Sequence, residues 1–283
     1  MSVLRVTVID LEAVKYYCGL GDIAMLAWLA TGAKAAGTPL AFYRRRNAEL
    51  LHLFGLDVRS EPGGLNLDWV FKVELGERGS RTRLDYLRDA LGITAPYLRP
   101  ELHLSDDDTA WAEARAADFP APLVLLFPQT AWKPREWPPN GWVDLAWGLK
   151  REGLSPLVML EKEDPRFANT PVFQWGTPIP KLAALMRHAA LVVGNDSFPA
   201  HLAGTVGTPT LALLGPTKPM VFGHTPDVEC MQSDLDCTGC HFAPPFRAAC
   251  DQGCFSLFRL SPDDVLRRVL EKVRPRPGVL PLA

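Results

Sequence analysis

The sequence lacks several features that would place the protein in a special class. It contains no uninterrupted apolar run of about 18 residues, so no segment is expected to span a membrane. It has no basic excess, since its net charge is −2, and this argues against a dedicated nucleic-acid-binding protein. The first residues, MSVLRVTVIDLEAV, lack the basic start, apolar stretch and cleavage site of a secretory leader. Together these absences predict a soluble protein of the cytoplasm.

The N-terminal part of the chain reads as alternating strands and helices. Apolar patterns predict strands at 3–9, 39–43 and 56–59, and helices at 23–36, 47–54 and 83–91. Ser105 is expected to cap a further helix whose acidic first turn suits the positive end of the helix dipole. The two prolines of PAPLV at 120–124 end that helix and precede a new strand, which predicts a boundary near residue 120.

The second part alternates again, and this defines the expected fold. Strands are predicted at 123–127, 157–160, 191–193 and 210–214, with helices at 141–151, 181–188 and 198–206. Such alternation is typical of parallel sheets with crossover helices. We therefore predict an α/β protein with two Rossmann-like domains facing a cleft, 1–119 and 120–273, followed by a tail at 274–283. Ligands of such sheets bind beyond the carboxyl ends of the strands, where the polar turns 19–22 and 195–201 would lie.

One polar cluster within LVVGNDSFPAHLAGTVGTPTLALLGPT (191–217) admits two interpretations. Asn195, Asp196, Ser197 and His201 stand between two apolar strand candidates, at the start of a helix with Pro199 in its first turn. A strand that ends in such a turn directs free backbone N–H groups toward an anion above the sheet edge. Alternatively, Asp196 and Ser197 simply cap the helix.

The six cysteines are unevenly distributed. Cys18 stands alone, whereas five others fall between residues 230 and 254. In a reducing compartment such clustering favours a metal over disulfides, and two closely spaced pairs can present four thiolates to one zinc or iron ion. The alternative is reduced thiols packed as small hydrophobic groups, or disulfides formed in air. The expected structural metal ligands are Cys237, Cys240, Cys250 and Cys254, with Cys230 and His241 as spare candidates.

Four motifs in the same order resemble one enzyme family. GNDSFPAHLAGTVGTPTLALLGPTKP resembles the signature of glycosyltransferase family 9, which includes the heptosyltransferases of lipopolysaccharide synthesis. GLGDIAM, starting at Gly19, is similar to the family's glycine-rich turn, and FPQTAWKPREWP is similar to its segment ending in K-x-W-P. The cysteine-rich stretch is similar to one that many members carry before the final helix. The match covers most of the chain.

The resemblance implies a GT-B fold and an inverting sugar transfer without a catalytic metal. The N-terminal domain, short for the family, would bind the acceptor and the C-terminal domain the nucleotide-sugar. The implied donor is ADP-heptose, and the acceptor hydroxyl belongs to a glycan, a lipid-linked molecule or a protein, which is compatible with peripheral membrane contact. The alternative is a catalytically weak relative that binds nucleotide-sugar or glycan as a partner subunit.

The resemblance also assigns roles to residues. Asp22, in the turn that contains Gly19 and Gly21, matches the base that takes the proton of the acceptor hydroxyl. The expected donor-binding residues are Lys133, Arg135, Asp196, Ser197, His201, Thr217 and Lys218. The cysteine site would lie outside the motifs that carry transfer.

Two motifs depart from the family pattern, and the role of one basic run stays open. Ser197 and Phe198 replace a threonine and a glycine, and a glycine there would let a phosphate approach the backbone closely. Arg135 replaces the lysine of K-x-W-P; it keeps the charge but grips phosphate differently. The basic run YRRR at 43–46 fits a solvated charge run better than an acceptor-binding surface.

Overall fold

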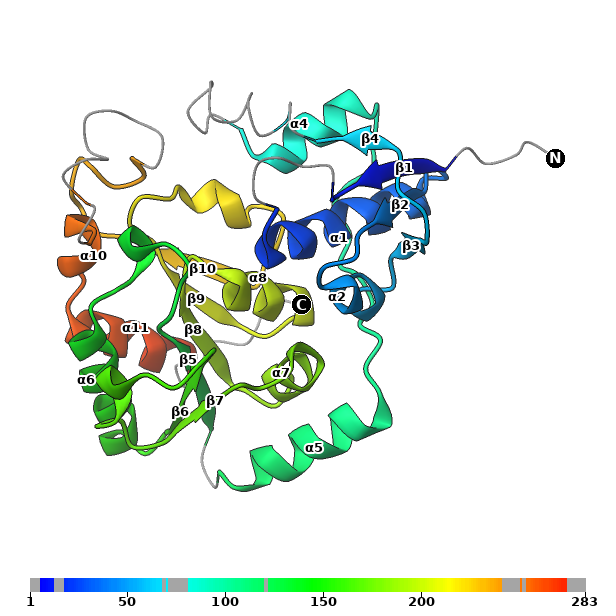
Figure 1. Cartoon of the computed structure of the whole chain (residues 1–283). Helices are drawn as coiled ribbons and strands as arrows, with labels where there is room; N and C mark the ends of the chain where they lie inside the picture. The colour runs from blue at the N-terminus through cyan, green and yellow to red at the C-terminus, as the bar shows by residue number, and fades with distance from the viewer. Residues whose placement is uncertain are drawn as a thin grey trace, which may run out of the picture.

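The computed structural model describes residues 6–12, 18–67, 70, 81–119, 122–240, 250 and 253–273. They form two parallel sheets with helices around them, and the two sheets come from successive parts of the chain (Figure 1). The predicted α/β class and the arrangement of two Rossmann-like units are therefore confirmed. The division of the chain into domains at residue 120 stays a prediction.

The first sheet has the strand order β3-β2-β1-β4, and every pairing in it is parallel. Its central strand β1 pairs Thr7 with Leu40 of β2, and β1 is followed by the glycine turn that begins helix α1. The strands of this sheet are β1 (Thr7–Asp10), β2 (Leu40–Tyr43), β3 (Asp57–Arg59) and β4 (Leu65–Asn66). The helices of this part are α1 (Leu20–Ala35), α2 (Ala48–Leu53) and α4 (Arg83–Ala90).

The second sheet is larger and has the order β10-β9-β8-β5-β6-β7, again with parallel pairings. Its strands are β5 (Leu123–Phe127), β6 (Ser155–Leu160), β7 (Phe173–Trp175), β8 (Leu191–Asn195), β9 (Thr210–Leu213) and β10 (Val228–Met231). Its helices are α6 (Pro139–Arg151), α7 (Ile179–Met186), α8 (Phe198–Val206), α10 (Phe255–Phe258) and α11 (Pro262–Val273). Helix α5 (Asp106–Ala117) precedes this sheet, and Ser105 caps it as predicted.

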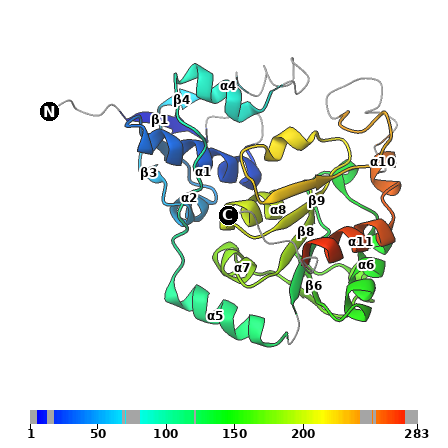
Figure 2. The same ribbon diagram turned by 180° about the vertical axis from the view of Figure 1, so that it is seen from behind.

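The central strands of the second sheet are buried on both faces, which explains their continuous apolar sequence. Side chains that alternate along a strand enter two separate cores. Val124 and Leu126 of β5 pack in one core with α6 and α11, whereas Leu123 and Leu125 pack in the other with α7 and α8. Figure 2 shows α6 and α11 together on one side of this sheet.

The second of these cores continues into the first part of the chain. Residues of α1, α2 and β2 belong to the same buried cluster as residues of β5, α7 and α8. Helix α1 packs against α8, where the Trp28 indole N–H donates to Thr205 Oγ1 over 3.0 Å. Helix α5 packs against α7, and Lys181 pairs with Asp107 at 3.0 Å. The two sheets are thus joined by a packed interface.

Most predicted elements are found within a few residues of their expected bounds. The sequence patterns did not predict β4, β7 or β10, which have two to four residues and incomplete burial. The start of the first predicted strand and the tail at 274–283 lie outside the described residues. No described helix combines the length and the apolar character needed to cross a bilayer.

His224 lies in the interface between the two sheets and gives it a pH dependence. Its ring contacts Trp28 at 5.6 Å and Tyr97 at 6.5 Å between centroids. Burial, with a contribution from His201, lowers the pKa of His224 to about 3. The unfolded chain binds a proton at about pH 6.5 and the folded chain does not, so stability is full above that pH and declines as pH falls toward 3.

We therefore expect the free energy of unfolding to decrease by about 1 kcal/mol per buried histidine between pH 7.5 and 5.5. Urea unfolding at both pH values measures this change. His224→Gln should make the decrease smaller, because it removes one of the groups that take up a proton on unfolding. The matched control is His188→Gln at an exposed position, which should leave the decrease unchanged. A decrease of the same size in His224→Gln would contradict the assignment.

Candidate active site

A cavity of about 760 Å³ lies between the two parts of the chain and receives residues from both. The first part contributes the starts of α1 and α4. The second part contributes the segments that follow β5, β6, β8 and β9, at the carboxyl edge of the sheet, as expected for open parallel sheets. The polar and charged lining residues are Asp22, Arg81, Thr82, Arg83, Gln129, Thr130, Arg135, Glu161, Thr177, Asp196, Ser197, His201, Thr217 and Lys218.

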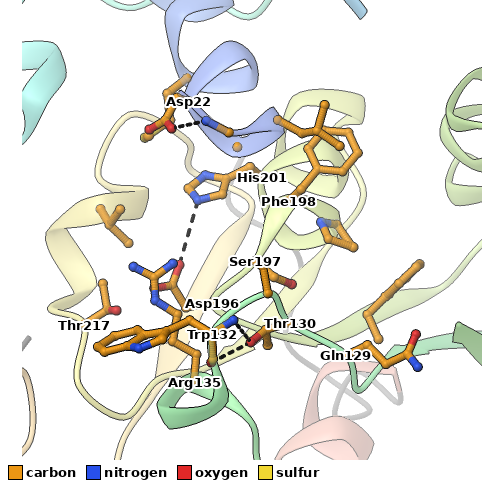
Figure 3. Close-up of a pocket in the computed structure, with 18 of the residues that line it drawn as sticks. Asp22, Gln129, Thr130, Trp132, Arg135, Asp196, Ser197, Phe198, His201 and Thr217 are labelled. Carbon is orange, nitrogen blue, oxygen red and sulfur yellow. Dashed lines mark hydrogen bonds and ion pairs between the residues drawn. The ribbon is translucent and has the colours of Figure 1, made fainter. Parts of the chain in front are cut away.

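Asp22 occupies the third position of α1 and faces this cavity from above in Figure 3. Its Oδ2 accepts a hydrogen bond of 2.7 Å from the Gly19 N–H, so the side chain closes the first turn of its own helix. Its Oδ1 forms an ion pair with Arg83, the first residue of α4. Asp22 therefore both caps its own helix and lines the cavity.

The glycine turn before α1 is held by a buried arginine. Arg44 donates from both terminal nitrogens to the Cys18 carbonyl at 3.2 Å and from Nε to the Arg46 carbonyl at 2.5 Å. Only 7% of Arg44 is exposed, so the expectation of a solvated run at 43–46 is wrong for this residue. Arg44 fixes the backbone that leads into Gly19 and Asp22.

Asp196 and Arg135 form a buried ion pair on the opposite side of the cavity. Arg135 Nε lies 3.1 Å from Asp196 Oδ2, and the Asp196 side chain is only 3% exposed. A carboxylate this deep needs a compensating charge, which the guanidinium provides. Arg135 also lies over the ring of Trp132, 5.4 Å from its centroid. Asp196 thus orients Arg135 at the cavity wall.

His201 lies between Asp22 and Asp196 in Figure 3. Its Nε2 is 3.9 Å from Asp196 Oδ1, its ring stacks on Phe222 at 4.3 Å, and a Cβ on Gly21 would come within 3.1 Å of it. Burial, followed by the charges of Arg135 and Arg83, lowers the pKa of His201 to about 3. His201 is therefore neutral at physiological pH. Its buried Nδ1 has no hydrogen-bond partner among the described residues.

Helix α8 begins at the cavity without a side-chain cap. Ser197 stands at the capping position, but its hydroxyl bonds to the Asn195 carbonyl at 3.4 Å and makes no capping bond. The Asp196 carboxylate faces Arg135 and His201 instead. The interpretation of Asp196 and Ser197 as plain caps is therefore wrong. Phe198, the first residue of α8, lines the cavity and packs on the core shared with α1.

The remaining cations that the sequence singled out differ in position. Lys133 pairs with Glu136 at 2.5 Å and is not among the residues that line the cavity. Lys218 and Thr217 do line it, and the Thr217 hydroxyl is buried without a hydrogen-bond partner among the described residues. Gly19 and Gly21 line it as well.

The cysteine turn 237–240 reaches the cavity. Gly239, between Cys237 and Cys240, is one of the lining residues, although the cysteines lie outside the sequence motifs assigned to transfer. The pKa of the Cys240 thiol is raised by burial and then by the charges of Cys254, Cys250 and Cys237. Among described residues, no group of three or more His, Cys, Asp or Glu is arranged to hold a metal as it stands.

Of the two spare ligand candidates, the structure describes only Cys230. His241 lies outside the described residues. Burial, followed by the charges of Asp196 and Glu229, raises the pKa of the Cys230 thiol to about 12. Cys230 thus has carboxylates as its electrostatic neighbours, on edge strand β10.

Sequence reasoning missed several lining residues. Arg81, Thr82 and Arg83 enter from a part of the chain that carries no recognisable motif. Glu161 directly follows β6, and the rule that ligands bind at strand ends could have indicated it. Gln129 stands within the FPQTAW segment, and its amide binds the Glu161 N–H at 2.7 Å.

The cavity lies between two Rossmann-like units, and comparison with known families places the chain among enzymes. Residues 51–243 match the profile of glycosyltransferase family 9 (heptosyltransferase), which is more than half of the chain. The chain therefore belongs to glycosyltransferase family 9 and is a glycosyltransferase. A segment of 38 residues is 53% identical to lipopolysaccharide heptosyltransferase 3 of Escherichia coli, covering 13% of this chain but only 11% of that protein.

Solved structures support the fold over nearly the whole chain. A family 9 glycosyltransferase from Veillonella parvula DSM 2008 superposes with a TM-score of 0.70 at 13% identity, covering 96% of this chain and 98% of that one. TibC, a dodecameric, iron-containing glycosyltransferase of enterotoxigenic E. coli H10407, gives a TM-score of 0.65 at 17% identity, covering 95% and 78%. TibC has also been solved with ADP-D-β-D-heptose.

Proposed function

We propose that the protein is an inverting glycosyltransferase that moves a sugar from a nucleotide-diphosphate donor to a hydroxyl group. The observation that carries this proposal is the placement of Asp22 across one cavity from the uncapped start of α8 and its neighbouring cations. A carboxylate on one side and a diphosphate-binding surface on the other are what an in-line displacement requires.

The donor we infer is ADP-heptose, bound by residues 120–273. Support comes from TibC, which shares the fold and has been solved with ADP-D-β-D-heptose. The backbone N–H groups at the start of α8 favour a diphosphate, since Ser197 leaves them uncapped. Arg135 and Lys218 would neutralise its charge, and Thr217 and His201 would donate hydrogen bonds.

The reaction we infer is a single displacement. The acceptor oxygen attacks the anomeric carbon while the bond from that carbon to the diphosphate oxygen breaks, which inverts the configuration. Asp22 takes the proton of the acceptor hydroxyl, and the released ADP carries away the electron pair and the negative charge. The cations and N–H groups on the donor side stabilise that charge as it develops.

The acceptor would bind on residues 1–119, next to Asp22, Arg81 and Arg83. We infer a glycan, a lipid-linked molecule or a protein hydroxyl as its class, and a cytoplasmic enzyme that meets a membrane-associated acceptor at the membrane surface. A second candidate is a catalytically weak relative that binds nucleotide-sugar or glycan for a partner subunit. The ion pair between Asp22 and Arg83 favours it, because Arg83 occupies the carboxylate that would act as the base.

A panel of nucleotide-sugars in a thermal-shift assay identifies the donor, since a ligand that binds the folded state raises the melting temperature. Release of ADP from ADP-heptose, with and without candidate acceptors, separates the two candidates. Acceptor-dependent release supports the enzyme, whereas donor binding without turnover supports the binding protein.

We also propose a structural zinc or iron ion at the cysteine cluster. TibC is described as iron-containing, and Cys237, Cys240, Cys250 and Cys254 are electrostatic neighbours here. Four thiolates would leave no open coordination position, so the ion would hold the segment and take no part in transfer.

Asp22→Asn should slow sugar transfer by roughly 10²–10⁴-fold, because the amide cannot accept the proton. ADP affinity and the melting temperature should stay near those of the wild type. Transfer is measured as ADP release and ADP binding by calorimetry. The matched control is Asp57→Asn, an exposed carboxylate of β3, which should transfer normally. Near-normal transfer by Asp22→Asn would remove Asp22 from the mechanism.

His201→Ala should weaken ADP binding by about 1.5–3 kcal/mol, the value of a hydrogen bond to a charged group. Adenosine, which lacks the diphosphate, should bind with nearly unchanged affinity. Calorimetric titration with both ligands measures the difference, and exposed His188→Ala serves as the control. Equal losses for ADP and adenosine would assign His201 to the fold instead.

Protein purified under reducing conditions should contain about one equivalent of zinc or iron by elemental analysis, if the four cysteines hold one ion. Cys250→Ser should lose most of this metal. Cys230→Ser should retain it, because Cys230 lies on strand β10 outside the cluster. Metal-free wild-type protein, or equal metal content in all three proteins, would contradict this proposal.

A further inference from the structure

Lys218 differs from the other cationic side chains of the cavity in its ion pairing. Four cationic side chains line the cavity, and three of them are paired: Arg81 with Asp89, Arg83 with Asp22 and Arg135 with Asp196. Within the described part of the chain, Lys218 alone among these four has no carboxylate at ion-pair distance. Its charge can therefore meet an anionic ligand without breaking an ion pair with any residue that the structure describes.

The stem of Lys218 lies on the cysteine turn 237–240. A Cβ added to Gly239 would come within 3.0 Å of Lys218 Cγ and 4.0 Å of both its Cα and Cε. Gly239 adopts φ +75°, and its N–H donates to the Gly215 carbonyl over 2.9 Å. Only a glycine combines this backbone conformation with such a close approach.

The loop 215–218, which carries Lys218, also contacts Cys254 and Gln232. A Cβ on Gly215 would lie 2.8 Å from the Cys254 sulfur, so this cysteine packs directly on the first residue of the loop. The Gln232 amide donates to the Thr217 carbonyl over 2.9 Å. The segment around the cysteines thus contacts the loop at both ends, at Gly215 and at Lys218.

We propose that the cysteine turn 237–240 is part of the donor site, with Gly239 as a positioning residue that seats Lys218 against the diphosphate. This inference rests on the proposed function, because it deepens the description of the same site. The cysteine turn would then affect donor affinity, because Gly239 contacts Lys218 and Lys218 contacts the donor.

A double-mutant cycle tests the proposal with ADP and adenosine as the titrated ligands. Lys218→Met should weaken ADP binding about tenfold, as expected for the loss of one charge-assisted contact. Gly239→Ala should weaken it by a similar factor, because the added methyl group displaces the lysine stem. The double variant should bind ADP about as well as Lys218→Met alone, and adenosine affinity should stay constant throughout.

The matched control is Gly153→Ala, since Gly153 has φ +77° but no heavy atom within 4 Å of its added Cβ. It carries the same backbone strain without the contact and should bind ADP normally. If Gly239→Ala does not fold, Gly239→Asn replaces it, because asparagine tolerates the left-handed region better.

The outcomes separate the inference from the proposed function. Wild-type protein that does not bind ADP overturns both. Wild-type protein that binds ADP, with Gly239→Ala binding equally well, overturns only the inference. A full additional loss from Gly239→Ala in the Lys218→Met background also overturns it, since the glycine would then act through the fold rather than through Lys218.

Discussion

The packing of helix α1 against helix α8 is the constraint on which the site depends. These helices come from different halves of the chain, and each begins at the cavity, α1 with Asp22 in its first turn and α8 with Phe198 as its first residue. The Trp28–Thr205 hydrogen bond and the contact between Gly21 and His201 fix their separation. Because one buried cluster extends through both halves, the distance between the proposed base and the donor surface is a property of the core.

Electrostatic pairing then decides what the cavity can bind. Burial keeps His201 neutral, so it can donate to a phosphate without first changing its protonation state. Asp196 offsets the charge of Arg135 and orients it, which reduces the cost of holding a cation at a cavity wall. In the proposed mechanism, the pair of Asp22 with Arg83 sets a condition on catalysis, because the acceptor must reach the carboxylate beside that guanidinium. The binding of the acceptor and the availability of the base are therefore linked.

Sequence periodicity predicted the parts of the fold that are buried on both faces. Strand β5 and helix α8 were found at their expected bounds because their patterns extend over several residues and end in clear turn signals. Strand β7 was missed because three half-exposed residues carry no period. In the site, the motifs predicted the lining positions of the second half, whereas Arg83 reaches Asp22 across 61 residues of sequence, a contact that only the tertiary fold determines.

Phe198 shows how the start of α8 can carry a residue that differs from the family pattern. A phenylalanine in place of the family's glycine would obstruct a phosphate if its ring covered the N–H groups of the first turn. Phe198 instead packs on the core shared with α1, where it adds to the contact between the two halves. The first-turn N–H groups of α8 belong to the backbone, so the anion-binding role that we propose for them does not depend on the side chain at position 198, and Lys218, in contact with Gly239, lines the same cavity. The side chains around α8 can therefore differ from the family pattern without removing the backbone groups on which the proposed anion binding rests.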